Sequence, residues 1–220
     1  MKKTAIVLGA GSRGNAYAHY SLSFPEQLQI VGVAEPDTDR RRVFAETYHV
    51  PEENCFEDWK DILSRPKMAD AAFVCTMDNM HTEPAIRALE LGYHVLLEKP
   101  MSNRPEECLQ IERAAAASGK VLSVCHGLRY TPFYCTLKKL VDEGAGGEVA
   151  TIDQIENVGY WHQAHSFVRG NWRNSSQSSP MILQKSCHDL DIISWLAGRP
   201  CRWISSFGSL QHFDAAHAPE

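Results

Sequence analysis

The chain has 220 residues, 44% of them hydrophobic, and a formal net charge of −5 at pH 7. This length favours one complete domain followed by a smaller unit. Basic and acidic residues are mixed along the chain, so neither a nucleic-acid partner nor a membrane surface is indicated. The seven cysteines contain no CxxC pair and predict reduced, buried thiols without bound metal. No run is long enough for a secretory signal or a transmembrane helix, so we expect a cytoplasmic protein.

The first apolar run, residues 4–8, leads directly into a glycine-rich turn with the spacing GxGxxG, and a helix is predicted from Asn15 to Ser23. In this arrangement the first glycine makes the turn, the second lets backbone amides approach a pyrophosphate, and the third lets the helix pack closely on the strand. The amides of the first helical turn then face the phosphates. The turn residues predicted to contact the cofactor are Gly9, Gly11, Ser12, Arg13 and Gly14.

A second strand, predicted from Leu28 to Ala34, ends in Glu35. An acidic residue about 20 residues beyond the glycines can accept hydrogen bonds from both ribose hydroxyls and would repel a 2′-phosphate. NAD is therefore predicted rather than NADP, unless Arg40 and Arg41 fold back over the ribose. The alternative is a glycine-rich turn with no ligand. The order of strand, turn, helix, strand and acid favours the dinucleotide.

Strand and helix continue to alternate up to about residue 126. This alternation implies right-handed crossovers and an α/β fold with a doubly wound parallel sheet of the Rossmann type, residues 1–126. Gly92 and Gly119 are predicted to follow the ends of two of the helices. The predicted helices are 38–48, 59–64, 83–91 and 104–118, and the predicted strands are 55–56, 71–76, 93–97 and 121–125.

Residues 127–220 follow a different pattern, which predicts a partial α+β domain for substrate binding or oligomer contacts. Helices are expected at 132–143 and 181–196 and strands at 148–158 and 202–210, while the tail from Phe213 has no periodicity. Between them, residues 160–180 form a polar and aromatic loop. Its residue types suit a substrate wall, although a surface loop is the simpler alternative.

Four motifs occur in this order: GxGxxG, Thr76-x-x-x-x-His81, Glu98-Lys99-Pro100, and Lys185-Ser-Cys-His188-Asp-Leu-Asp191. Together they resemble the Gfo/Idh/MocA family of nicotinamide-dependent oxidoreductases. The resemblance implies a homo-oligomer and a second domain larger than residues 127–220 provide, so the chain is expected to be either truncated or an unusually short member. Gln184 stands where the family often has an acidic residue, and Lys185 lies next to it.

The resemblance also implies roles for individual residues. Lys99 would sit over the nicotinamide and handle the substrate hydroxyl, and His188 would act as acid or base. Lys185 could have taken over part of the proton transfer. Thr76, His81 and Glu98 would line the cofactor, and the substrate wall would include Arg129, Tyr130, Trp161, Trp172 and Arg173.

The residues alone give partial support to these roles. Lys99 lies at the carboxyl end of a buried parallel strand, where ligands bind in open α/β sheets, and burial lowers the pKa of an ammonium toward a useful range. The alternative is a solvated lysine at a strand end. Lys185 and His188 share one helix face with Asp191 near them, although a single histidine on a helix is more often packed or exposed than catalytic.

We therefore predict an oxidoreductase that transfers a hydride between NAD and a hydroxyl or carbonyl group of a sugar, cyclitol or related polyol. One alternative is an enzyme resembling NAD-dependent glycoside hydrolases, in which transient oxidation gives no net NADH. The other is a non-catalytic nucleotide-binding homologue. The intact Lys99 and His188 argue against the last alternative, whereas Gln184 favours it.

Overall fold

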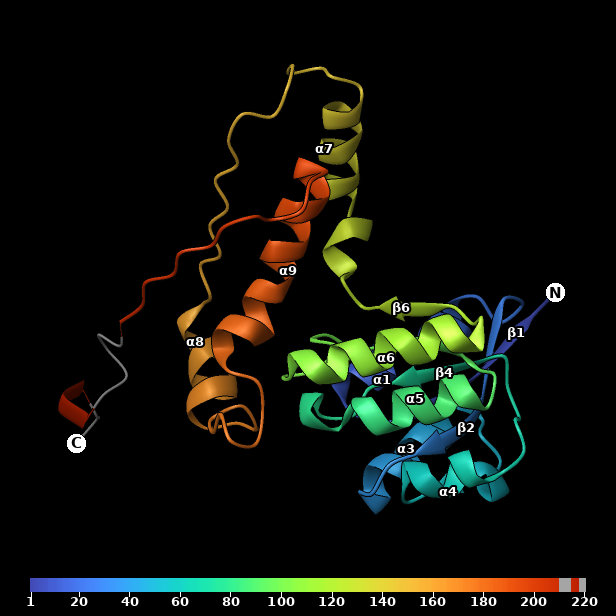
Figure 1. Ribbon diagram of the computed structural model, residues 1–220. Helices are drawn as coiled ribbons and strands as arrows, with labels where there is room; N and C mark the ends of the chain where they lie inside the picture. The colour runs from blue at the N-terminus through green and yellow to red at the C-terminus, as the bar shows by residue number, and fades with distance from the viewer. Residues whose placement is uncertain (210–214, 218–220) are drawn as a thin grey trace. The chain divides into compact units, whose positions relative to one another are not determined.

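The structure, a computed structural model, describes residues 1–209 and 215–217 (Figure 1). The chain divides into two compact units, Met1–Cys125 and His126–Glu220. Most of the predicted tail, and the last residue of the strand predicted at 202–210, lie outside the described residues.

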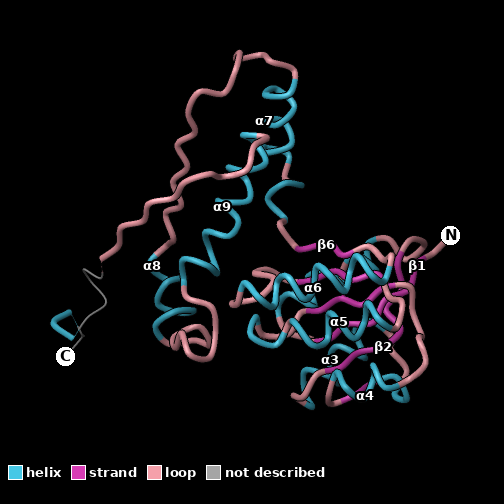
Figure 2. The backbone as a smooth tube through the Cα atoms, in the orientation of Figure 1, coloured by secondary structure: helices cyan, strands magenta, loops and turns pink. Residues whose placement is uncertain are grey.

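The first unit contains a six-stranded parallel sheet with the strand order β3-β2-β1-β4-β5-β6 (Figure 2). This is the order of the doubly wound Rossmann fold, and the predicted fold class is confirmed for this unit. β2 and β3 lie on one side of β1, and β4, β5 and β6 lie on the other. The strand order thus switches sides at β1, and the cofactor crevice is expected at the carboxyl end of that strand. The strands are β1 Lys3–Leu8, β2 Leu28–Ala34, β3 Cys55–Phe56, β4 Ala71–Val74, β5 His94–Leu97 and β6 Leu122–Val124.

Helices cover both faces of the sheet because alternate residues of each strand point to opposite sides. Ala5 and Val7 of β1 pack in one cluster with residues of α1 and α3. Ile6 and Leu8 pack in the other cluster with residues of α4, α5 and α6. The helices of this unit are α1 Ser12–Ala18, α2 Tyr20–Ser23, α3 Thr38–Tyr48, α4 Trp59–Ser64, α5 Thr82–Glu90 and α6 Pro105–Ser118, with 3-10 turns at Glu52–Asn54 and Asp78–Met80.

Several helix ends are set by single residues. The Asp37 carboxylate caps α3 by accepting the Arg40 N–H at 2.9 Å, and Gly119 ends α6 with a φ of +63°. The predicted end at Gly92 is also confirmed, with a φ of +85° just after α5. The helix predicted from Asn15 begins earlier, at Ser12, because the glycine turn is tight enough for the next residues to be helical already.

The described residues of the second unit form helices joined by extended and irregular chain. The predicted strands at 148–158 and 202–209 are wrong, since none of these residues is in a strand. An alternating apolar pattern forms a strand only where a neighbouring strand pairs with its backbone groups, and the described part of this unit offers none. Its helices are α7 Pro132–Asp142, α8 Tyr160–His162 and α9 Met181–Ala197, with a π-helix at Gln163–Val168 and 3-10 turns at Gly127–Tyr130 and Ala215–His217.

All seven cysteines are free thiols. Cys135 and Cys201 are exposed and the other five are half-buried, so the prediction of buried thiols is wrong for the first two and only partly met by the rest. Among the described residues, no helix combines the length and the apolar character that crossing a bilayer requires.

Candidate functional site

Three glycines shape the turn after β1, each in a different way. Gly9 has a φ of +96°, and a Cβ there would lie 2.6 Å from the carbonyl oxygen of Cys75. A Cβ at Gly14 would lie 2.1 Å from the carbonyl oxygen of Gly9. Around Gly11, by contrast, a Cβ would meet no atom within 4 Å. The turn is thus packed tightly at both ends and open in the middle, where a pyrophosphate would approach the backbone.

Glu35, at the carboxyl end of β2, is buried and fixed by backbone amides. Its Oε2 accepts the N–H of Ala10 at 2.8 Å, and its Oε1 accepts the N–H of Asp37 at 3.1 Å. The Nη1 of Arg40 lies 4.0 Å from Oε1, while Arg41 donates a hydrogen bond to the main-chain oxygen of Glu35. A carboxylate has about four lone-pair sites, so this one can still accept a ribose hydroxyl. Both arginines therefore lie beside Glu35, the residue whose carboxylate would repel a 2′-phosphate.

His81 joins the turn after β4 to the turn after β5. Its ring is only 1% exposed, with Nε2 at 3.1 Å from the carbonyl oxygen of Thr76 and Nδ1 at 2.9 Å from that of Pro100. Burial lowers the pKa of His81, which favours the neutral ring with a single N–H to donate. The hydroxyl of Thr76 donates to the carbonyl oxygen of Met80 at 3.3 Å. The neutral ring can donate to only one of the two carbonyl oxygens and packs against the other, and a cofactor contact for His81 stays a prediction.

The Glu98-Lys99-Pro100 turn follows β5, and its Lys99–Pro100 peptide bond is cis. The Glu98 carboxylate is buried, and its Oε2 accepts the N–H of Lys99 at 2.8 Å. Its Oε1 accepts a hydrogen bond from the hydroxyl of Tyr17, and the Nε of Arg13 lies 4.0 Å from the same oxygen. Lys99 itself is half-buried. The turn is therefore held from α1 as well as from its own strand.

The predicted cofactor residues of the first unit lie at one edge of the sheet. The glycine turn, Thr76, Glu98 and Lys99 follow the carboxyl ends of β1, β4 and β5, and Glu35 follows β2. Since parallel strands end at the same edge, the sheet brings these residues together.

In the second unit, Arg129 forms a two-pronged ion pair with Asp191 of α9. The Nε and Nη2 atoms of Arg129 lie 2.7 Å and 2.6 Å from the two carboxylate oxygens, and this hydrogen bonding raises the pKa of Arg129. Asp191 also lies 4.0 Å from the Nδ1 of His126, whose ring meets His188 edge to face at 5.8 Å between centroids. Tyr130 is 78% exposed.

Lys185, His188 and Asp191 all lie on α9, and two of them contact side chains outside this predicted grouping. The Nζ of Lys185 lies 2.7 Å from the Nε2 of His162, whereas Asp191 pairs with Arg129. His162 stacks on the exposed ring of Trp161 at 5.3 Å. The loop residues predicted for the substrate wall are partly helical: Trp161 lies in α8, while half-buried Trp172 and exposed Arg173 follow the π-helix.

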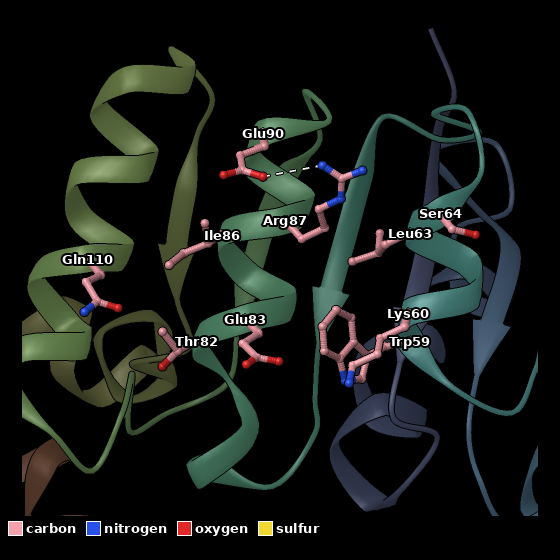
Figure 3. Close-up of a pocket in the computed structure, with 10 residues that line it drawn as sticks. All are labelled: Trp59, Lys60, Leu63, Ser64, Thr82, Glu83, Ile86, Arg87, Glu90 and Gln110. Atoms are coloured by element: carbon pink, nitrogen blue, oxygen red, sulfur yellow. Dashed lines mark hydrogen bonds and ion pairs between the residues drawn. The ribbon is translucent and has the colours of Figure 1, made fainter.

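A cavity of about 500 Å³ lies among α4, α5 and α6 in the first unit (Figure 3). Trp59, Leu63 and Ile86 give it apolar walls, and an ion pair of 3.5 Å between Arg87 and Glu90 lies beside it. None of its lining residues belongs to the glycine turn, to the end of β2 or to the turn after β5. The cavity is therefore separate from the predicted cofactor residues. The other lining residues are Lys60, Ser64, Thr82, Glu83 and Gln110.

Comparison with known families identifies both parts of the chain. The Gfo/Idh/MocA model, described as an oxidoreductase family with an NAD-binding Rossmann fold, matches residues 3–126. The C-terminal domain model of the same family matches residues 134–218. The chain belongs to the Gfo/Idh/MocA family.

Two curated relatives and one solved structure illustrate the range of this family. The scyllo-inositol 2-dehydrogenase (NADP(+)) IolW of Bacillus subtilis is 27% identical over 196 residues, which cover 88% of this chain and 51% of that protein. The 2,7-anhydro-N-acetylneuraminate hydratase of Mediterraneibacter gnavus is 27% identical over 202 residues, covering 89% and 50%. The myo-inositol 2-dehydrogenase structure from Lactobacillus plantarum has a TM-score of 0.75 at 22% identity, covering 90% and 57%. The chain spans about half the length of the curated relatives it matches.

The residues present fit the dinucleotide that the Gfo/Idh/MocA Rossmann domain binds. The space beside Gly11 is open, and the buried carboxylate of Glu35, which follows β2 at the same sheet edge, could accept ribose hydroxyls. The prediction of a nicotinamide cofactor is thus confirmed at the level of the family, with NADP not excluded.

Sequence reasoning missed Tyr17 and Cys125, which surround the buried Glu98. Burial raises the pKa of Tyr17, and hydrogen bonds with Cys125 and Glu98 raise it further. Burial also raises the pKa of Cys125 to about 11 and that of Cys75 well above its usual value. Only the position of Tyr17, three residues after Gly14 on the helix that follows the turn, could have pointed to it.

Proposed function

We propose that the protein is an NAD-dependent oxidoreductase that acts on a hydroxyl or carbonyl group of a sugar, a cyclitol or a related polyol. The observation that carries the proposal is the position of Lys99. It follows β5 at the sheet edge that also carries the glycine turn and Glu35, next to a buried carboxylate that holds its main chain. The relative named scyllo-inositol 2-dehydrogenase supports the substrate class.

Each step of such a reaction has a candidate group in the first unit. Backbone amides around Gly11 would bind the pyrophosphate, and Glu35 would bind the adenosine ribose. When bound, the nicotinamide ring supplies the hydride chemistry. Lys99 would take the hydroxyl proton during oxidation and return it during reduction. In the second unit, His188 is the next candidate for proton transfer, and Lys185 is its rival.

The direct test is a screen of inositol isomers, sugars and sugar acids with NAD and with NADP, following NADH or NADPH absorbance together with product analysis. We expect oxidation of at least one polyol. Lys99→Met should lower the rate by about 10² to 10⁴, the usual contribution of general acid–base catalysis, with little change in NAD affinity. Lys120→Met is the matched control, since Lys120 precedes β6 at the opposite edge of the sheet and should leave the rate unchanged.

The same assay tests the assignment of roles. If Lys99→Met keeps near-normal turnover while Lys185→Met abolishes it, proton transfer belongs to Lys185. His188→Ala should cost less than Lys99→Met if His188 only assists the lysine, and at least as much if it is the base itself.

A second candidate is a reaction without net oxidation, and the relative named as a hydratase favours it. In that case substrate would be converted while NADH absorbance stays constant, and the product would keep the oxidation state of the substrate. The product analysis in the same screen separates the two reactions.

A further inference from the structure

Tyr17 connects helix α1 to the turn that carries Lys99. Its hydroxyl donates a hydrogen bond to the Oε1 atom of Glu98, 81 residues further along the chain. The thiol of Cys125, just after β6, is near enough to help raise the pKa of this hydroxyl. α1 begins at the glycine turn, so a single side chain joins the phosphate side of the site to the turn after β5.

The direction of the hydrogen bond between Tyr17 and Glu98 follows from the chemistry of the two groups. Burial is the main cause that raises the pKa of Tyr17, so its phenol keeps its one proton at neutral pH. That proton is donated to the Oε1 atom of Glu98. Burial also raises the pKa of the neighbouring Cys125 thiol, to about 11. Tyr17 is therefore a neutral donor in a buried polar group.

Glu98 links Tyr17 to Lys99 because its two carboxylate oxygens accept from different residues. While Oε1 accepts from Tyr17, Oε2 accepts the main-chain N–H of Lys99 at 2.8 Å. Arg13 also lies near Oε1, but its side chain is 64% exposed and its Nε lies 4.0 Å away. A long ion pair with a largely solvated arginine contributes little. Tyr17 thus helps to fix the orientation of the carboxylate that accepts the Lys99 amide.

The strand order places this group at the nicotinamide end of the site. In a doubly wound sheet the dinucleotide lies across the switch point at β1. Glu35, the ribose ligand of the adenosine half, is on β2 at one side of β1. Glu98 follows β5, which lies on the other side of β1 beyond β4. The nicotinamide half would extend toward β4 and β5, so a change at Tyr17 should weaken the binding of that half and not of the adenosine half.

We propose that Tyr17 is a positioning residue for the nicotinamide half of the cofactor, acting through Glu98 on the turn that carries Lys99. This inference rests on the proposed function only for the nature of the cofactor. It does not depend on which substrate is turned over, or on whether any substrate is found.

The test compares two ligands on the full chain. NADH is titrated through its fluorescence, and ADP-ribose, which lacks the nicotinamide, is titrated by calorimetry. Tyr17→Phe removes only the hydroxyl, and hydrogen bonds to charged groups are strong, so we expect about three- to tenfold weaker NADH binding. ADP-ribose should bind as it does to the wild type. Tyr93→Phe is the matched control: its hydroxyl accepts the N–H of Met68 at 3.0 Å, and Tyr93 precedes β5 whereas Glu98 follows it, so neither affinity should change.

A double variant shows whether the effect passes through Glu98. In a Glu98→Gln background, Tyr17→Phe should cause little further loss of NADH affinity, because the charged acceptor is already gone. If Tyr17→Phe does not fold, Glu98→Gln alone must reproduce the selective loss for NADH. Unchanged NADH affinity, or an equal loss for both ligands, would overturn the proposal. A failed polyol screen would overturn the proposed function and leave this result standing.

Discussion

Gly11 and Gly14 lie three residues apart, and alanine at each is expected to damage a different property of the protein. At Gly14 the added Cβ would lie 2.1 Å from the carbonyl oxygen of Gly9, so the turn and helix α1 must separate by roughly 1 Å or more to restore an ordinary contact. Overpacking of this kind costs about 1–3 kcal/mol. For a chain of this length, each kcal/mol lowers Tm by about 2–4 °C. We therefore expect Gly14→Ala to lower Tm by about 2–12 °C.

Gly11→Ala should leave the stability of the fold nearly unchanged and weaken the binding of the cofactor. Gly11 has a φ of −69°, which alanine adopts without strain, and no atom lies within 4 Å of the added Cβ. Replacing glycine by alanine at a position with such a backbone conformation stabilises a protein by about 0.4–1 kcal/mol, because the unfolded chain becomes less flexible. The methyl group would, however, stand where backbone amides meet the pyrophosphate. A loss of about 1.4 kcal/mol there corresponds to tenfold weaker NAD binding.

Two measurements on each variant separate these effects: thermal unfolding followed by circular dichroism, and NAD titration by calorimetry. If Gly11→Ala binds NAD as tightly as the wild type, the pyrophosphate does not approach the backbone at this glycine. If Gly14→Ala keeps the wild-type Tm, the close packing of α1 on the turn does not stabilise the unit.

Three further predictions concern the cofactor, pH and association. NAD should bind more tightly than NADP because a 2′-phosphate would meet the carboxylate of Glu35, and Arg40→Ala should weaken NADP alone; equal affinities in parallel titrations would contradict this. Burial lowers the pKa of His81, so the unfolded chain binds more protons and stability should fall as pH drops from about 6.5 through the lowered folded value. His81→Gln should flatten that dependence in urea titrations. The side chains of Trp203 and Phe207 are 92% and 97% exposed, so the chain should self-associate and bind a hydrophobic dye. A clean monomer in sedimentation, or no change with Phe207→Ser, would argue otherwise.

Local patterns were sufficient to predict the first unit. Buried strands appear in the sequence as short apolar runs, and glycines such as Gly92 and Gly119 mark helix ends because they adopt positive φ without strain. The predicted helix 38–48 agrees with α3 at both ends. Each of these signals depends on neighbours within a few residues, so one sequence contains all the information needed.

Features that depend on distant residues could not be predicted in the same way. Tyr17, Glu98 and Cys125 come from three separate elements, and only the folded sheet brings their polar groups together. The strands predicted at 148–158 and 202–209 failed for a related reason: whether an alternating pattern becomes a strand depends on a pairing partner elsewhere. The structure brings the motif residues of the first unit to one edge of the sheet. That this edge is the active site, and the roles of Lys99 and His188, stay predictions.

The hydrogen bond between Glu35 and the Ala10 amide has a consequence for changing the cofactor preference. A designer who wants the protein to accept NADP would first replace Glu35 by a small neutral residue. That replacement would also leave the Ala10 N–H, inside the phosphate-binding turn, without the acceptor that holds it at 2.8 Å. The preference for NAD or NADP and the conformation of the turn therefore both depend on Glu35. A redesign that keeps Glu35 and works through the exposed side chain of Arg40 would alter the preference while leaving the turn intact.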